Sequence, residues 1–269
     1  MQIHMPYFDM ILSRLEAGDK DFEEAFRRHI HFGIWEDPES AYDDLADSIR
    51  AMDRLCLHLI ELAGVQNGQD ILDVGCGFGG TVATIDEHFS NVRLTGLNID
   101  PRQLELARKR VTPKPDNQMQ FVVGDACEMP FPDASFDRVL AIECIFHFPS
   151  RLAFFEHARR VLRPGGCMTM TDFLLPDEAA PALFENLGEA LWGPYTAVDL
   201  LGYRELASQV GLVMTHHQNI TACVRPSYAF FGQLLGRHFP RVEEITRTST
   251  LIMDVGGLGY STLRFDLPA

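Results

Sequence analysis

Apolar runs and amphipathic segments alternate through the middle of the chain. Three segments in this region, 81–89, 101–109 and 150–162, have apolar residues at helical spacing. Because the runs between them are continuously apolar, they predict a parallel sheet that is covered by helices on both faces. The runs of strand length are "DILDV" (70–74), "VRLTGLNI" (92–99), "MQFVVGDA" (119–126), "FDRVLAIE" (136–143) and "CMTMTDFLL" (167–175).

The segments before and after this region have a different pattern of apolar residues. Upstream, apolar residues recur at helical spacing from Tyr42 to Ala63, and Gly64 is a suitable C-cap. We therefore expect a helical lid or cap over 1–64, a core over 65–175, and a substrate cap with the last sheet elements over 176–269. The patterns after Pro176 are helices at 182–191, 200–210 and 227–239 and strands at 212–220 and 259–267.

Composition narrows the class of protein. The 269 residues are 46% hydrophobic and 23% charged, which is typical of a globular chain. Acids outnumber bases 38 to 23, and the net charge of -15 argues against a nucleic-acid partner. No apolar run approaches the roughly 20 residues of a membrane span. The N-terminus lacks a signal-peptide pattern, and the six cysteines lack CxxC spacing, so we expect a cytoplasmic protein with reduced thiols. The sequence leaves open whether the protein forms a homo-oligomer.

A glycine-rich turn follows the first strand. In "DVGCGFGGT", Gly75, Gly77 and Gly80 fit G-x-G-x-x-G between a strand and a helix. The free N–H groups at a helix N-terminus can bind an anionic group. That group could be the pyrophosphate of a nicotinamide dinucleotide or the carboxylate of S-adenosylmethionine, and an ordinary tight turn would also fit.

Several further motifs occur in order with this turn. "ILDVGCGFGG", "LTGLNIDPRQLELAR", "FVVGDACEMPFPDASFD" and "LRPGG" resemble the class I S-adenosylmethionine-dependent methyltransferases over roughly residues 65–175. "HIHFGIW", "GLNIDPRQ" and "AIECIFHFPSR" are similar to the small-molecule subgroup, which includes tocopherol- and sarcosine-type and natural-product enzymes. The resemblance implies a Rossmann-like, doubly wound α/β fold. Its mostly parallel sheet would have seven strands, with a helical cap inserted after strand five.

The resemblance also implies cofactor contacts. Asn98 stands where the family usually has an acid that binds the ribose, and its amide can both donate and accept hydrogen bonds. Asp100 is better suited to cap the helix that begins at Pro101. The expected contacts are Asp73, Gly75 and Gly77 at the methionine moiety, Asn98 and Gln103 at the ribose, and Asp125 and Ala126 at the adenine.

Three residues are candidates for catalysis. Glu143 and His147 lie just past strand four, at the carboxyl edge where ligands bind in such sheets. In the resembled enzymes a histidine at the place of His147 is the general base. The alternatives are that His147 caps the following helix and that Glu143 binds the sulfonium or the methionine amine. Asp172 is a candidate to orient His147 or the acceptor.

The stretch "RRHIHFGIWEDP" (27–38) is open to three interpretations, which are a metal site, a surface loop and a flap over a bound group. His29 and His31 with the following acids could bind a metal, but no further ligands occur at zinc spacing. Magnesium that bridges an acidic substrate such as a diphosphate is the less favoured alternative. In the resembled enzymes such a segment covers the cofactor. Gly33 would then supply a bend, and Trp35 would cover the methionine end.

The function that these observations predict is methyl transfer from S-adenosylmethionine to a small-molecule acceptor by in-line displacement. The accepting atom is oxygen, nitrogen or activated carbon. The alternatives are a nicotinamide-dependent oxidoreductase and a non-methylating S-adenosylmethionine-binding protein or cyclase on the same fold.

Overall fold

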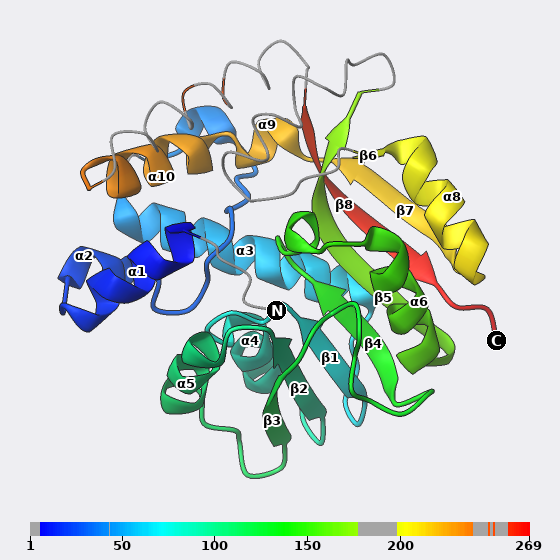
Figure 1. Ribbon diagram of the computed structural model, residues 1–269. Coiled ribbons are helices and arrows are strands. Elements are labelled where there is room, and N and C mark those ends of the chain that lie inside the picture. Colours follow the sequence, from blue (N-terminus) through cyan, green and yellow to red (C-terminus); the bar gives the residue numbers. More distant parts are fainter. Residues whose placement is uncertain (1–5, 43, 177–197, 239–246, 248–249, 251–257) are drawn as a thin grey trace.

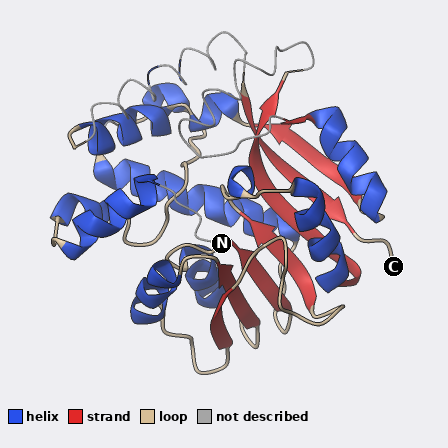
Figure 2. Cartoon of the chain, viewed as in Figure 1, coloured by secondary structure: helices blue, strands red, loops and turns tan. Residues whose placement is uncertain are grey.

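A computed structural model describes residues 6–42, 44–176, 198–238, 247, 250 and 258–269. A twisted sheet forms its centre, and helices lie on both faces (Figure 1, Figure 2). The strands are β1 (Asp70–Val74), β2 (Arg93–Asn98), β3 (Gln118–Val123), β4 (Phe136–Ala141), β5 (Leu162–Leu175), β6 (Val198–Asp199), β7 (Val213–Asn219) and β8 (Gly259–Asp266).

The sheet is mostly parallel. Its strands follow the order β3-β2-β1-β4-β5-β8-β7, and the short β6 pairs with β5. Strands β1 to β5 are parallel to one another, whereas β8 is antiparallel to both β5 and β7. The predicted Rossmann-like α/β fold with seven main strands is confirmed. Because the strand order reverses between β1 and β4, a crevice opens at their carboxyl ends.

The helices form two layers and a cluster at one end. Residues of α3 and α4 belong to a core on one face of the sheet, and residues of α6 and α8 belong to the core on the other. A third core joins α1, α2 and α10. The helices are α1 (Pro6–Glu16), α2 (Lys20–Ala25), α3 (Leu45–Ala63), α4 (Gly80–His88), α5 (Pro101–Arg110), α6 (Arg151–Val161), α8 (Leu200–Val210), α9 (Thr221–Val224) and α10 (Pro226–Gly236), with one-turn 3₁₀ helices η1 (Pro38–Ser40) and η2 (Ile145–His147).

The ends of α3 follow from its local sequence. We expected this helix from Tyr42, but it begins at Leu45, because the Asp44 carboxylate caps it by accepting a hydrogen bond from the Asp47 N–H at 2.6 Å. Gly64 ends the helix in the left-handed conformation, as predicted. The helix predicted at 182–191, and with it most of the expected cap after strand five, lies outside the described residues. Among the residues described, no helix is both long and apolar enough to cross a membrane.

The segment that joins α2 to η1 runs across the carboxyl edge of the sheet, and we call residues 27–35 the N-terminal segment. Its Ile34 N–H donates to the Ala51 carbonyl of α3 at 3.0 Å, and its Trp35 N–H donates to the Cys223 carbonyl of α9 at 2.9 Å. Gly33 packs so closely on α3 that a Cβ there would lie 2.4 Å from the Cβ of Ala51. Close backbone approach therefore requires glycine at this position.

We predict that Gly33→Ala lowers the free energy of unfolding by about 1–3 kcal/mol, because the added methyl group overpacks the contact with α3. Urea unfolding measures this change. Glu36→Ala is the control, since Glu36 is exposed and lies three residues along the chain. Equal stability of Gly33→Ala and the unmodified protein would contradict the packing of this segment on α3.

Candidate active site

A pocket occupies the crevice between the carboxyl ends of β1 and β4. Its walls come from the turn after β1, the end of β2, the loop after β3 and the loop after β4. The N-terminal segment and Phe8 of α1 close it from the side opposite the sheet. Nine residues that the sequence singled out line this pocket: Asp73, Gly75, Gly77, Asn98, Gln103, Asp125, Ala126, Glu143 and His147.

The turn after β1 presents its backbone to the pocket. Gly75 and Gly77 have φ of 69° and 52°, and a Cβ on Gly75 would lie 2.6 Å from the Cβ of Cys144. The Gly75 N–H donates to the Leu97 carbonyl of β2 at 2.8 Å, which fixes the turn. Only glycine fits this turn, because a side chain would clash with the loop after β4.

Asp73 supplies a buried carboxyl group beneath this turn. The residue is 2% exposed, and its Oδ2 atom has no hydrogen-bond partner. Burial raises the pKa of Asp73 to about 8, although the interaction with the Thr81 hydroxyl opposes the rise. A buried acceptor without a donor is costly, so this oxygen is suited to a bound group that carries N–H donors.

The ends of β2 and β3 carry the remaining predicted cofactor residues. The Asn98 side-chain amide donates to the Gln103 side-chain carbonyl at 3.0 Å, and both residues are buried. Asp100 does cap α5, since its carboxylate accepts a hydrogen bond from the Arg102 N–H at 2.9 Å. Asp125 accepts a hydrogen bond from the Cys127 N–H at 2.8 Å and lines the pocket together with Ala126.

Glu143 links the loop after β4 to two distant parts of the chain. Its Oε2 atom accepts hydrogen bonds from the Phe32 N–H at 2.7 Å and from the Tyr260 hydroxyl at 2.8 Å. Its φ is 52°, a left-handed conformation that is uncommon outside glycine. Burial raises the pKa of Glu143 to about 8, against the opposing effect of these two hydrogen bonds.

His147 ends η2 and lines the same pocket. Its N–H donates to the Cys144 carbonyl at 3.0 Å, and its ring lies 4.4 Å from that of Phe146 and 6.2 Å from that of Phe8, between centroids. The helix-cap alternative for His147 is wrong, because the Ser150 hydroxyl caps α6 by accepting a hydrogen bond from the Ala153 N–H.

Asp172 lies elsewhere, contrary to its predicted role beside His147. It is fully buried and is not a pocket residue. Its Oδ2 atom accepts hydrogen bonds from Arg151 of α6, 2.9 Å from Nη2, and from the Tyr203 hydroxyl of α8. Successive strand residues point to opposite faces of the sheet. Accordingly, Thr171 contacts the Glu143 side of the sheet, whereas Asp172 faces α6 and α8.

Trp35 does not line the pocket either. The structure therefore does not place it over the methionine end of the cofactor site, as we had predicted. Its indole N–H donates to the Asp47 carboxylate at 2.7 Å, and the side chain is buried against the start of α3. Residues earlier in the N-terminal segment cover the cavity instead. They are Arg28, His29, Ile30 and His31.

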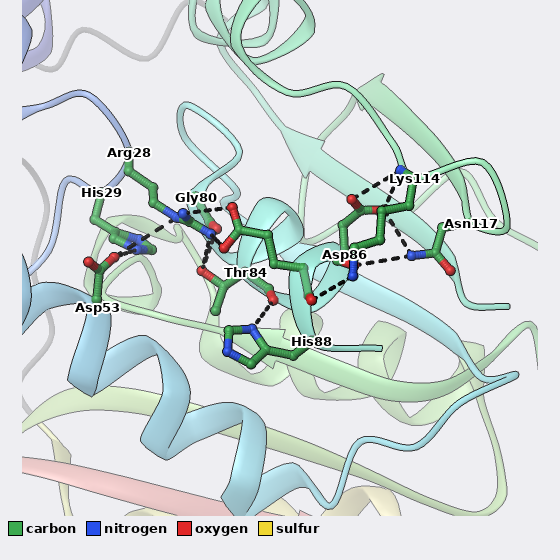
Figure 3. A network of polar contacts seen from close by, with 10 residues as sticks. Arg28, His29, Asp53, Gly80, Thr84, Asp86, His88, Lys114 and Asn117 are labelled. Atoms are coloured by element: carbon green, nitrogen blue, oxygen red, sulfur yellow. Dashed lines mark hydrogen bonds and ion pairs between the residues drawn. The ribbon is translucent and has the colours of Figure 1, made fainter. Parts of the chain in front are cut away.

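Polar contacts fasten this cover to α3 and α4 (Figure 3). Arg28 donates to the Glu87 carboxylate at 2.7 Å and to the Thr84 hydroxyl at 2.9 Å. The His29 ring lies 3.1 Å from the Asp53 carboxylate. Burial lowers the pKa of His29, while Asp53 opposes that change, so this contact joins a neutral imidazole to a carboxylate.

His31 packs beside His29 but does not form a metal site with it in the described structure. The two ring centroids are 4.5 Å apart, and burial, helped by His29, lowers the pKa of His31 to about 3. Its Nδ1 atom lies 2.8 Å from the Phe32 carbonyl, and its buried Nε2 atom has no partner. Within the described parts of the chain, no group of three His, Cys, Asp or Glu residues is arranged to hold a metal ion.

Known proteins resemble this chain over most of its length. A family model described as "Methyltransferase domain" matches residues 72–170. The 27-O-demethylrifamycin SV methyltransferase of Amycolatopsis mediterranei is 32% identical over 209 residues, which are 77% of this chain and 74% of that protein. The O-methyltransferase cnsE of Penicillium expansum is 30% identical and covers 87% of this chain and 84% of its own length.

The chain belongs to the class I S-adenosylmethionine-dependent methyltransferases. Solved structures agree on the fold. A putative sarcosine dimethylglycine methyltransferase from Galdieria sulphuraria superposes with a TM-score of 0.79 at 21% identity, covering 94% of this chain and 98% of that one. A geranyl diphosphate C-methyltransferase from Streptomyces coelicolor has a TM-score of 0.77 at 17% identity, covering 99% of this chain and 100% of its own. The protein is therefore an S-adenosylmethionine-dependent enzyme that acts on small molecules.

The pocket of this methyltransferase fits S-adenosylmethionine. The unpartnered Oδ2 atom of Asp73 suits the methionine ammonium group, and the glycine turn admits the methionine chain close to the backbone. The Asn98 and Gln103 amides and the Asp125 carboxyl line the same cavity and offer it polar groups. The predicted cofactor residues, Trp35 excepted, thus line one cavity.

Sequence reasoning missed several pocket residues. Phe8, Arg28 and Thr81 line the cavity, and Tyr260 supports Glu143 from behind. The helical spacing around Phe8 indicated only an amphipathic helix. Tyr260 follows Glu143 by 117 residues, and only the pairing of β5 with β8 brings the two together.

We predict that Gly77→Arg abolishes binding of S-adenosylhomocysteine, because the side chain would enter the cavity beside Ile30 and Gln103. Isothermal titration calorimetry measures the binding, and NAD is the control ligand that neither protein should bind. Gly165→Arg is the matched control, since Gly165 also has a positive φ, 76°, but a Cβ there meets nothing within 4 Å. Retained affinity in Gly77→Arg would exclude the glycine turn as the site.

Asp73 should also make the stability of the cofactor-free enzyme depend on pH. Its pKa of about 8 in the folded protein lies above the value of about 3.9 for an unfolded chain. The folded protein then holds a proton that the unfolded chain loses, so this contribution to the free energy of unfolding falls as pH rises from about 4 to about 8. Asp73→Asn should remove that fall, which urea unfolding at about pH 5 and about pH 8 would measure. Parallel pH dependence in both proteins would contradict the assignment.

Proposed function

We propose that this methyltransferase transfers the methyl group to a hydroxyl oxygen of a small natural-product-type molecule, with His147 as general base. The observation that carries the proposal is the position of His147 in the same cavity as the cofactor residues. Relatives with 30–36% identity support an oxygen acceptor, because several are named as O-methyltransferases. These names describe the relatives, and the acceptor of this chain follows only by analogy.

The chemistry requires an aligned acceptor and removal of its proton. S-adenosylmethionine supplies an electrophilic methyl group on a sulfonium, and an in-line displacement moves that group to a nucleophile. Histidine is the side chain that most often serves as a general base, so the His147 imidazole can take the hydroxyl proton as the bond forms. The ring packs against that of Phe146, with 4.4 Å between the centroids.

The surroundings of His147 favour an apolar acceptor body. The apolar side chains of Phe8, Ile30, Ile142 and Phe148 line the same cavity as His147. Such walls stabilise an apolar molecule by removing its surface from water, at about 25 cal/mol per Å². A hydroxyl on an otherwise apolar molecule would therefore be held with its oxygen near His147.

The N-terminal segment keeps water out of the reaction. His29 and His31 are both buried, and the Arg28 contacts hold the segment against α4. Because both the cofactor and the acceptor must pass this segment, it has to open and close in every turnover. The neutral His29 and His31 rings add no positive charge that would repel a sulfonium.

Identification of the acceptor tests the proposal directly. The enzyme is incubated with methyl-labelled S-adenosylmethionine and an extract of host metabolites, and the labelled product is identified by mass spectrometry and NMR. A new methoxy group on a small molecule is the expected result. A labelled methyl on carbon or nitrogen would overturn the oxygen assignment and leave the methyltransferase family assignment intact.

His147→Ala should lower turnover of that acceptor by about 10²–10⁴-fold while leaving the affinity for S-adenosylhomocysteine unchanged. The reason is that the imidazole removes a proton only during the chemical step. Steady-state kinetics and calorimetry provide the two measurements. His217→Ala is the control, since His217 lies on β7 and does not line the pocket. Equal turnover in both variants would remove His147 from the mechanism.

A further inference from the structure

Tyr260 is a buried residue of β8 whose hydroxyl group contacts the active-site carboxylate from behind. The side chain is 0% exposed, and its hydroxyl oxygen lies 2.8 Å from Glu143 Oε2 and 2.9 Å from Thr171 Oγ1. Tyr260 and Thr171 are not pocket residues, whereas Glu143 is. The hydroxyl group of Tyr260 therefore reaches the pocket through the carboxylate of Glu143.

Proton counting shows that these groups form a closed ring. The Glu143 N–H donates to Thr171 Oγ1 at 2.8 Å. When Glu143 is ionised its carboxylate can only accept, and tyrosine has one hydroxyl proton, so in that form Tyr260 donates to Glu143 Oε2 and the Thr171 hydroxyl donates to Tyr260. The backbone and the side chain of Glu143 are thus held by one ring of three hydrogen bonds.

The backbone of Glu143 explains why such a ring is needed. Its φ of 52° is a strained conformation for a residue with a side chain, and such conformations persist only where neighbouring contacts fix them. The ring fixes the residue from β5 and β8, and the Phe32 N–H adds a donor from the N-terminal segment. Both donors are directed at Oε2. Among the described residues Oε1 has no hydrogen bond, and it is not one of the buried polar atoms that lack a partner. This atom is therefore accessible from the pocket.

We propose that Tyr260 is a positioning residue that holds Glu143 with Oε1 directed into the pocket and Oε2 turned toward β8 and the N-terminal segment. The proposal rests on the proposed function, in which this pocket holds S-adenosylmethionine and the acceptor. In this arrangement Tyr260 and the closed N-terminal segment stabilise the ionised carboxylate together. Opening of the segment removes the Phe32 donor and leaves Tyr260 as the remaining one.

Other ionisable groups face the same cavity, so their titrations must be distinguished from that of Glu143 in any measurement. They are Asp73 and Cys76 of the turn after β1, Arg28, His29 and His31 of the N-terminal segment, Asp125 after β3, and Cys144 and His147 after β4. A spectroscopic signal assigned to Glu143 alone avoids this overlap.

The experiment follows the titration of Glu143 by infrared difference spectroscopy on the cofactor-free protein. The carbonyl stretch of the protonated carboxyl is assigned to Glu143 by its loss in Glu143→Gln. Tyr260→Phe keeps the buried ring and removes one donor to the carboxylate, so the titration midpoint should rise by about one pH unit. Thr171→Val removes the next donor in the ring and should raise the midpoint by a smaller amount.

Tyr203→Phe is the matched control. Tyr203 is also 0% exposed, and its hydroxyl also contacts a buried carboxylate, that of Asp172, but on the opposite face of the sheet. It should lose stability as Tyr260→Phe does and leave the Glu143 midpoint unchanged. An unchanged midpoint in Tyr260→Phe overturns the proposal. If that variant does not fold, an unchanged midpoint in Thr171→Val overturns it.

The role of Tyr260 and the proposed function can be tested separately. Calorimetry on the unmodified protein shows whether it binds S-adenosylhomocysteine, and failure there removes the proposed function whatever the titration shows. If the protein binds S-adenosylhomocysteine normally but the titration midpoints do not move, the proposed function stands and Tyr260 is not a positioning residue.

Discussion

The reversal of strand order between β1 and β4 is the constraint on which the rest of the site depends. Two halves of the chain leave this point in opposite directions, so their connections cannot fill the gap between them. The turn after β1 and the loop after β4 therefore face each other across one crevice. The other pocket walls come from the end of β2, the loop after β3, the N-terminal segment and α1.

The electrostatic character of the crevice depends on its ionisable side chains that have no partner of opposite charge. Asp73 and Glu143 are both carboxyl groups with a pKa raised to about 8 by burial, and their described hydrogen-bond donors are neutral. The covering histidines have lowered pKa values and stay uncharged. The charged side chain of the cover, Arg28, is paired with the Glu87 carboxylate. Binding of a ligand with positive groups favours the ionised form of the two carboxyls. Net charge alone would not reveal this, because it describes the whole surface.

Most of the sheet and most of the residues that line the pocket could be predicted from the sequence, since both depend on local signals. The continuous apolar runs specified β1 to β5, and the positions of Asp73, Asn98 and Asp125 at strand ends placed them at one edge. Asp172 was misjudged because its strand position did not show which face of β5 it occupies. Trp35 was misjudged for a related reason: the direction of an irregular segment is set by its packing on α3 and α9, which no local pattern records.

The ring that joins Glu143 to Tyr260 has a consequence for biosynthesis. Along the chain Phe32 precedes Glu143 by 111 residues and Tyr260 follows it by 117, so the three parts can meet only after Tyr260 has left the ribosome. Contacts between residues so distant along the chain form late, because a long loop must close first. Strands β1 to β4 can pair beforehand. The carboxylate therefore reaches its working geometry only after β8 has inserted between β5 and β7, and a nascent chain that already contains the whole glycine turn is still unable to complete its active site.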